Sequence, residues 1–119
     1  MGAVNRLEAL LVTLERRVGY VGELTTTGRR SGKPRHAITG FVREGDGSLL
    51  VAAQATDSAW VNNLRSTQEC EFRVQNRTDR FMAHELSGTE RDTAIRRIRR
   101  RYFGDTRYLA CPAFRLTRV

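Results

Sequence analysis

The sequence predicts a mainly β fold, a small barrel of about six mostly antiparallel strands with helices packed outside it. About six short segments are rich in β-branched, aromatic or alternating apolar residues, which is typical of strands. Tight-turn signals separate several of these segments, and strands joined by tight turns pair antiparallel. The chain has 119 residues, enough for one domain and too few for two, so we expect a single domain over 1–119.

The first half of the chain is expected to form a helix and then three strands. Leucine and valine side chains recur at helical spacing between Val4 and Val18, which predicts an amphipathic helix there. A loop rich in glycine and basic residues is expected over Gly28–Pro34, and Gly45-Asp46-Gly47 is a tight-turn signal. The three expected strands span residues 20–27, 35–43 and 48–53.

A short helix and two strands are expected in the middle of the chain. Asp57 or Ser58 can cap a helix that runs through Leu64. Apolar and polar residues alternate after it, and Cys70 falls on the apolar face, where we expect it to be a small core residue. The two strands are expected over residues 69–76 and 80–86, with a turn over 77–79 between them.

The last part of the chain is expected to form a helix and a final strand over Ala113–Val119. Ser87 and Glu90 have the spacing of a capping box, which marks the start of a helix. Four apolar residues then share one helical face, and Gly104 follows as a stop signal. These four residues are Ala94, Ile95, Ile98 and Tyr102.

The unusual feature of the composition is its basic charge. The net charge is +8, from 21 Lys and Arg against 13 Asp and Glu, and all of these basic residues except Lys33 are arginine. Such an excess suggests an anionic partner, which could be nucleic acid, an acidic membrane surface or a phosphorylated small molecule. Genome composition alone can also favour arginine over lysine. The excess lies in two segments: Arg29, Arg30, Lys33 and Arg35 in the loop, and Arg96, Arg97, Arg99, Arg100 and Arg101 in the last helix.

The arginines of the last helix flank its apolar stripe and lie near its C-terminus. Their long stems can cover apolar surface while the charged heads stay in water, and cations are favoured at this end of a helix. A solvated helix face is therefore the expected role. Nucleic-acid binding is the alternative, although no aromatic side chains interleave with the arginines to stack on bases.

The basic loop predicts a phosphate cradle. Gly28 and Gly32 let the backbone turn sharply and approach a ligand closely. Ser31 and the loop amides can donate hydrogen bonds to phosphate oxygens, and arginine matches phosphate with two parallel bonds. A solvated hairpin with no ligand is the alternative for this segment.

Trp60 is the only tryptophan, and it falls on the expected short helix. A lone tryptophan is usually a core residue. Asn62 and Asn63 follow it, and amides near the start of a helix could instead bind polar atoms of a ligand.

Several classes of protein are not supported by the sequence. Cys70, Cys111, His36 and His84 do not have the spacing of a zinc site, and no common nucleophile or nucleotide-binding motif occurs. No run of about 20 apolar residues predicts a transmembrane segment. The N-terminal residues lack the uninterrupted apolar centre of a signal peptide, so a cytoplasmic protein is expected.

Three motifs together resemble the deazaflavin-dependent nitroreductase family, which belongs to the split β-barrel flavin and deazaflavin oxidoreductases. The first is Leu24-Thr25-Thr26-Thr27-Gly28-Arg29-Arg30-Ser31-Gly32-Lys33-Pro34-Arg35. The others are Leu50-Val51-Ala52-Ala53 and Trp60-x-x-Asn63-Leu64. The resemblance covers about half of the chain, from Leu24 to Leu86, and its motifs are more specific in combination than alone.

The resemblance implies a split β-barrel, often dimeric, that binds an 8-hydroxy-5-deazaflavin coenzyme (coenzyme F420). Such proteins use the reduced coenzyme to deliver hydride to an electron-poor small organic substrate. The family's basic loop holds the phosphate-bearing tail of the coenzyme, and its strand end and short helix lie against the coenzyme as well. These roles map to Arg29, Arg30, Ser31 and Arg35 in the loop, Ala53 and Gln54 at the strand end, and Trp60 and Asn63 on the helix.

The chain departs from the family pattern in two places. Many members have a longer glycine-rich segment before the tryptophan, whereas this chain has only residues 54–59, which include the acidic Asp57. Some members place C-terminal tyrosines over the substrate, and here Tyr102 and Tyr108 are the candidates, with Tyr102 also on the apolar stripe. His36 follows the basic loop and either contacts the ligand or is structural.

Two other functions stay open from the sequence. A split-barrel protein could bind FMN, haem or another ligand, with different chemistry or none. A small basic barrel that binds nucleic acid is the second alternative, and the position of the charge makes it the weaker one, because the loop charges suit a phosphorylated small molecule better than a polymer.

Overall fold

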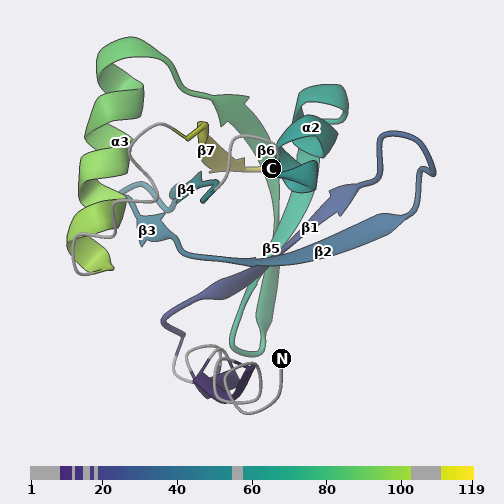
Figure 1. Ribbon diagram of the computed structural model, residues 1–119, viewed down its shortest axis with the longest axis horizontal. Helices are drawn as coiled ribbons and strands as arrows, with labels where there is room; N and C mark the ends of the chain where they lie inside the picture. Colours follow the sequence, from purple (N-terminus) through teal and green to yellow (C-terminus); the bar gives the residue numbers. More distant parts are fainter. Residues whose placement is uncertain (1–8, 12, 15–16, 18, 55–57, 103–110) are drawn as a thin grey trace.

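The computed structural model describes residues 9–11, 13–14, 17, 19–54, 58–102 and 111–119. In these residues, seven strands form one antiparallel sheet in the order β2-β1-β5-β6-β7-β4-β3 (Figure 1). The predicted mainly β fold with flanking helices is confirmed. The strands are β1 (Gly22–Thr27), β2 (Pro34–Thr39), β3 (Val42–Arg43), β4 (Leu49–Ala52), β5 (Glu69–Val74), β6 (Arg77–Glu85) and β7 (Ala113–Arg118). The helices are α2 (Ala59–Ser66), before β5, and α3 (Gly88–Arg101), before β7.

The sheet is curled into an open barrel, because β2 and β3 are consecutive in the sequence but lie at opposite ends of the strand order. Only Gly40 and Phe41 connect them. The Tyr102 hydroxyl accepts a hydrogen bond from the Phe41 N–H at 2.9 Å and donates one to the Tyr20 carbonyl at 2.6 Å. A Cβ on Gly40 would lie 2.7 Å from the Tyr102 ring, so only glycine fits at this bend. Tyr102 thus bridges the chain segments that lie just beyond the last paired residues of β1 and β2, Gly22 and Thr39.

This bend corrects the expected strand over 35–43, which is divided into β2 and β3. The N–H of Phe41 bonds to a side-chain hydroxyl rather than to a neighbouring strand, so the ladder is interrupted there. The described residues therefore contain seven strands where about six were expected.

The apolar side chains form two clusters on the two faces of the curled sheet. The interior cluster includes Leu24, Phe41, Phe72, Phe81 and Phe114, each at most 2% exposed. The second cluster lies between the sheet and α3, where burial of the Ala94, Ile95 and Ile98 side chains confirms the predicted apolar stripe. Burial of a phenylalanine or leucine side chain stabilises the fold by about 1.5–3 kcal/mol.

Strand β4 contributes to both clusters. Leu49 and Val51 point into the interior, while Leu50 and Ala52 point towards α3. This double burial explains the continuous apolar run in the sequence, because a strand covered on both faces does not alternate. Ala53 and Gln54 follow directly after this doubly covered strand.

The turn expected over 77–79 is wrong. Val74 pairs with Arg77, so residues 75–76 form the turn and β6 begins at Arg77. Gln75 has a φ of 55°, a conformation that such a two-residue hairpin turn requires and that sequence rules assign to glycine or asparagine. The predicted alternation of β5 is confirmed, since Cys70 and Phe72 are buried there.

The capping box expected at the start of α3 is also wrong. Ser87 precedes the helix but makes no side-chain cap hydrogen bond. The Glu90 carboxylate instead accepts a hydrogen bond from Arg115 of β7 at 3.0 Å. Three residues with expected roles, Asp57, Gly104 and Tyr108, lie outside the described residues.

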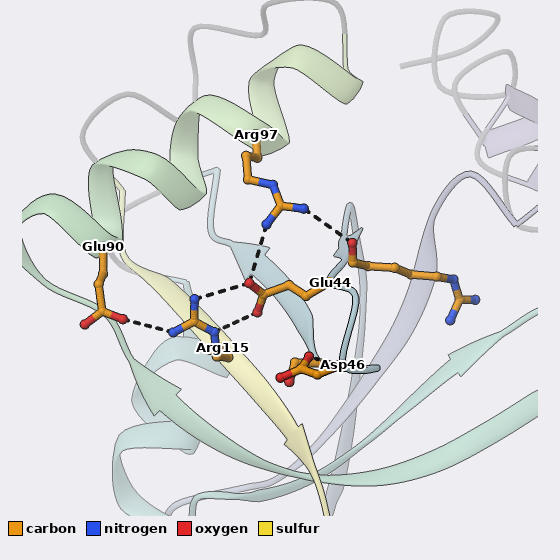
Figure 2. A network of polar contacts seen from close by, with 7 residues as sticks. Glu44, Asp46, Glu90, Arg97 and Arg115 are labelled. Carbon is orange, nitrogen blue, oxygen red and sulfur yellow. Dashed lines mark hydrogen bonds and ion pairs between the residues drawn. The ribbon is translucent and has the colours of Figure 1, made fainter.

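The arginines of α3 divide into structural and solvated ones. Arg97 donates to Glu44, which also accepts from Arg115, so the helix is tied to the β3–β4 hairpin and to β7 (Figure 2). Arg101 lies 4.8 Å from the centroid of the Phe41 ring and donates to the Tyr20 carbonyl at 3.1 Å. Arg96 and Arg100 are exposed. The expected solvated face is therefore correct for only part of the run.

The N-terminal segment is helical at each of its described residues, 9–11, 13–14 and 17. Leu10, Leu11 and Leu14 are 55%, 51% and 48% exposed, so these three residues of the predicted apolar stripe are only about half covered by the described part of the chain. No helix among the described residues is long and apolar enough to cross a bilayer.

Candidate functional site

A cleft of about 810 Å³ lies between the β1–β2 hairpin and α2. Its volume is within the range of small-molecule sites, which is roughly 300–1,000 Å³. Six of the eight residues that the sequence assigns to a site line this cleft, and they come from two segments about 30 positions apart. They are Arg29, Arg30, Ser31, Arg35, Trp60 and Asn63.

The other two assigned residues, Ala53 and Gln54, are not among the residues that line this cleft. The Ala53 side chain is only 1% exposed and belongs to the interior cluster. Gln54 is exposed at the end of β4. The structure thus brings the loop and helix residues together and places the strand-end residues apart from them.

The basic loop, residues 28–33, is closed by its own hydrogen bonds. Gly28 donates to the Lys33 carbonyl and Gly32 donates to the Gly28 carbonyl, each at 2.8 Å. The Lys33 N–H donates to the Ser31 hydroxyl at 3.2 Å. Gly32 has a φ of 68°, and a Cβ on Gly28 would lie 2.7 Å from the Ser31 oxygen. Glycine is therefore required at both positions, for a conformational reason at one and a steric reason at the other.

The cleft is electropositive. The Arg29, Arg30 and Arg35 side chains are exposed, and no residue that lines the cleft is a carboxylate. Within the described part of the chain, no carboxylate lies at ion-pair distance from these three guanidinium groups, whereas Arg97 and Arg115 are paired with Glu44. Unpaired cations in one concave site attract an anionic ligand.

Trp60 forms the opposite wall of the cleft. Its ring packs against Phe114 with a centroid distance of 5.8 Å, and the side chain is partly buried against the interior cluster. The same residue therefore anchors α2 to the core and offers the remaining part of its surface to the cleft. The sequence left a core position and a ligand contact open as alternatives; Trp60 packs against the core and also lines the cleft, and its contact with a ligand stays a prediction.

Asn63 connects the two walls of the cleft. Its side chain is buried, with 6% of the residue exposed. Its Oδ1 accepts a hydrogen bond from the Arg29 N–H at 3.1 Å, and its Nδ2 donates to the Thr26 hydroxyl at 3.1 Å. Both ends of the amide are thus occupied by the protein.

Thr26 is a residue that the sequence interpretation missed. It is 3% exposed and shares the inward face of β1 with Leu24. The available signal was the alternation of β1, which places every second residue of Leu24-Thr25-Thr26 on the same face. A buried threonine needs a hydrogen-bond partner, and that requirement could have pointed to Asn63.

His36 also lines the cleft. Its Nδ1 shares a hydrogen bond with the Thr25 hydroxyl at 2.9 Å and lies 3.8 Å from a Glu23 carboxylate oxygen. Thr25 and His36 are directly opposite each other in the β1–β2 ladder. His36 thus makes structural contacts within the hairpin and also lies at the cleft, so contact with a ligand stays a prediction.

Neither cysteine is placed for chemistry at the cleft. Cys70 and Cys111 are both buried, and neither lines the cleft. Burial raises the pKa of the Cys70 thiol to about 12, so it remains protonated at neutral pH. Among the described residues, no group of three histidine, cysteine or carboxylate side chains is arranged to hold a metal ion.

Comparison with known proteins identifies relatives of the fold and a matching family. The model of a family described as F420H(2)-dependent quinone reductase matches residues 6–111. The structure of an F420-H2 dependent reductase, FDR-A, is similar with a TM-score of 0.71 at 23% identity, covering 82% of this chain and 93% of that one. No curated protein matches the sequence.

Two further solved structures share the fold. One, described as a domain-swapped dimer, has a TM-score of 0.71 at 20% identity and covers 98% of this chain and 99% of its own. The haem storage protein HutZ from Vibrio cholerae has a TM-score of 0.69 at 16% identity, covering 92% of this chain and 89% of that one. At these identities the likeness establishes the split-barrel fold, and a deazaflavin protein and a haem protein both have it.

Proposed function

The chain belongs to the F420H(2)-dependent quinone reductase family, and from this membership we propose that the cleft between the basic loop and α2 holds the phosphate-bearing part of coenzyme F420. The protein is an F420-dependent oxidoreductase. We further propose that it transfers hydride to an electron-poor small organic molecule, for which a quinone is the example that the family's description supplies.

One observation carries the placement of the coenzyme. The cleft collects three guanidinium groups and a serine hydroxyl and has no carboxylate among its lining residues. Guanidinium groups bind phosphate oxygens with two parallel hydrogen bonds, and these charge-assisted bonds are about twice as strong as neutral ones. The donor set therefore fits a phosphorylated ligand.

The chain's own residues bind the coenzyme, orient it and shield it from water. Arg29, Arg30 and Arg35 neutralise the phosphate charge. The closed loop fixes the backbone of Arg29 and Arg30, and pairing of β1 with β2 fixes that of Arg35. Trp60 supplies a rigid apolar wall that excludes water from one side of the cleft. When bound, reduced coenzyme F420 supplies the hydride, so the protein contributes positioning and electrostatics rather than a nucleophile.

Ala53 and Gln54 remain the predicted neighbours of the tricyclic ring. Ala53 is only 1% exposed as a whole residue, and its N–H donates to the Pro112 carbonyl at 3.0 Å. Gln54 is exposed, and its amide can both donate and accept hydrogen bonds.

The proposal is tested by titrating the purified protein with coenzyme F420 and, separately, with FMN, while ligand fluorescence is followed. We expect saturable binding of F420 and much weaker binding of FMN. Tight binding of FMN without micromolar binding of F420 would contradict the proposal.

A pair of charge-reversal variants locates the site. The double variant R29E/R30E should weaken F420 binding by about a hundredfold or more, because each lost charge-assisted bond contributes about 1.5–3 kcal/mol. The control R96E/R100E makes the same charge change on exposed residues of α3 and should stay within about threefold of wild type. Equal effects of the two double variants would show that only the overall charge matters.

We also propose that the protein is a homodimer, as the family resemblance implies. The half-exposed Leu10, Leu11 and Leu14 side chains offer apolar surface, and a solved structure of the same fold is described as a domain-swapped dimer. Sedimentation equilibrium gives the mass in solution, and a monomer at all concentrations would refute this assignment.

A further inference from the structure

We propose that Thr26 is a positioning residue for the coenzyme site: its hydroxyl accepts a hydrogen bond that anchors the Asn63 amide, which in turn holds the Arg29 backbone. This inference rests on the proposed function, since it concerns the same cleft. Thr26 itself is not among the residues that line the cleft. Its effect on the ligand would therefore be transmitted through Asn63.

The orientation of the Asn63 amide follows from the chemistry of its partners. The Arg29 backbone N–H can only donate, so the amide oxygen must face it, as the 3.1 Å contact shows. The amide nitrogen must then face Thr26, 3.1 Å away, and the threonine hydroxyl must accept. A hydroxyl can accept while it donates elsewhere, so it suits this position.

The alternative orientation is unfavourable because it places two donors face to face. If the Asn63 amide rotated by half a turn, its NH₂ group would oppose the Arg29 N–H. Asn63 is 6% exposed and Thr26 is 3% exposed, so water has little access to replace a lost bond. The Arg29 N–H thus determines which way the amide points, and the Thr26 hydroxyl supplies the buried acceptor that the amide nitrogen needs in that orientation.

The two hydrogen bonds that join Thr26, Asn63 and the Arg29 backbone, here called the bridge, fix the basic loop relative to α2. The hydrogen bonds from Gly28 to Lys33 and from Gly32 to Gly28 close the loop on itself but do not connect it to the helix. The bond from Arg29 to Asn63 does connect them. Because Trp60 precedes Asn63 by three positions on α2, the bridge also sets the separation between the guanidinium wall and the tryptophan wall.

The decisive variant is Thr26→Val, which has nearly the same shape and lacks the hydroxyl. We expect its dissociation constant for F420 to rise about tenfold, since the loop loses one determinant of its position. Thr26→Ser restores the hydroxyl and should stay within about threefold of wild type. If Thr26→Ser binds as weakly as Thr26→Val, the methyl group and not the hydroxyl matters, and the proposal is wrong.

A matched control is available on the neighbouring strand β2. Thr39 is also buried, at 8% exposed, and lies at the other end of the β1–β2 hairpin, where its hydroxyl donates to the Gly40 carbonyl. Thr39→Val removes a buried hydroxyl without touching the bridge or a residue that lines the cleft, and it should leave the F420 dissociation constant within about twofold of wild type. An equal loss of affinity in the two valine variants would overturn the proposal.

A double-mutant cycle separates transmission through Asn63 from general weakening of the fold. In an Asn63→Ala background the amide is absent, so Thr26→Val should change the F420 dissociation constant by less than about twofold. Independent, multiplicative effects of the two substitutions would mean that Thr26 acts by another route.

A measurement without ligand keeps this inference distinct from the proposed function. Hydrogen exchange of the Arg29 amide, followed by NMR on the free protein, should accelerate about tenfold in Thr26→Val and stay unchanged in Thr39→Val. If wild type does not bind F420 but amide exchange responds in this way, the proposed hydrogen-bond bridge is supported and the proposed ligand is wrong. Unchanged exchange in Thr26→Val would refute the bridge itself.

Discussion

At the scale of single residues, the geometry of the candidate site depends on uncharged residues that are tightly surrounded by other atoms of the protein. The Asn63 amide bonds to both Arg29 and Thr26, and Gly28 has no room for a side chain. The arginines can bind a ligand only where these residues place them. Residues without charge thus decide how the charged ones act.

Gly28→Ala should weaken F420 binding by about five- to tenfold. Its new Cβ would lie 2.7 Å from the Ser31 hydroxyl oxygen and 3.1 Å from the Lys33 carbonyl oxygen, so the loop must shift. Fluorescence titration measures the change. Gly45→Ala is the control, since a Cβ there meets nothing within 4 Å, and it should bind F420 as wild type does.

Cys70 should make the fold less stable at high pH. Burial raises the pKa of its thiol from 9.0 to about 12, so the folded state keeps the proton that the unfolded state loses. Stability is therefore unaffected below pH 9 and falls between about pH 9 and 12, by at most about 1.4 kcal/mol per pH unit. Urea unfolding of wild type and Cys70→Ala at pH 7.5 and 10 checks this, since the variant should lose less stability; equal losses would exclude the thiol as a cause.

At the scale of elements, α3 is held to the sheet by apolar burial and by a partly buried ion network. The stripe of Ala94, Ile95 and Ile98 packs over β4 and β7. Arg115 of β7 contacts both Glu44 and Glu90, and both carboxylates raise the pKa of the guanidinium. Figure 2 shows these side chains converging between the helix and the β3–β4 hairpin. Arg97 and Arg101 of the helix thus make contacts within the fold.

Glu44→Gln should lower the free energy of unfolding by about 1–3 kcal/mol. The Glu44 side chain is 18% exposed and pairs with both Arg97 and Arg115, which would lose their common counter-charge. Glu90→Gln is the comparison. Its side chain is 69% exposed, so the loss should be below about 1 kcal/mol. Urea unfolding measures both, and a larger loss for Glu90→Gln would contradict the assigned order.

At the scale of the whole molecule, a side chain at the end of α3 stabilises the bend at which the sheet curls. β2 and β3 do not pair with each other, and the Tyr102 hydroxyl joins the Phe41 N–H of the bend to the Tyr20 carbonyl, beyond the last paired residues of β1 and β2. Tyr102 also packs against Tyr20, with ring centroids 4.7 Å apart. The end of α3 and the beginning of β1 are thus connected at the bend between β2 and β3 (Figure 1).

Tyr102→Phe should lower the melting temperature by about 4–8 °C. The substitution leaves the Phe41 N–H without this acceptor, which should lower the free energy of unfolding by about 1–2 kcal/mol. For a chain of this size, each kcal/mol lowers the melting temperature by about 4 °C. Tyr20→Phe removes a hydroxyl whose bond to the Arg101 carbonyl is exposed, and its effect should be smaller. Calorimetry gives both values. A melting temperature for Tyr102→Phe equal to that of wild type would rule out a stabilising role for this hydroxyl.

The sequence predicted the elements whose patterns are local. The alternation of β5, the apolar stripe of α3 and the last strand are confirmed, because each follows from the spacing of neighbouring residues. The turn over 77–79 and the capping box at Ser87 are wrong. Gln75 takes up the turn with a φ of 55°, and Glu90 bonds to Arg115 on another strand, so tertiary contacts overrode the local signals.

The sequence by itself determined the mainly β class with flanking helices and the concentration of charge in one glycine-flanked loop. The family resemblance identified Arg29, Arg30, Ser31 and Arg35 as a set, and they remain a set in the folded chain. The single domain over 1–119 stays a prediction. These conclusions need only composition, periodicity and short motifs, which are properties of neighbouring residues.

Only the tertiary structure decided which cations are available to a ligand. Both basic segments look alike in sequence, but Arg97 faces Glu44 and Arg101 faces aromatic rings and carbonyl groups, whereas the loop arginines face a cleft without carboxylates. Only the fold joins Thr26, Arg29 and Asn63, which come from a strand, a loop and a helix. The physical reason is that charge pairing and burial depend on distances in space, and a sequence gives only distances along the chain.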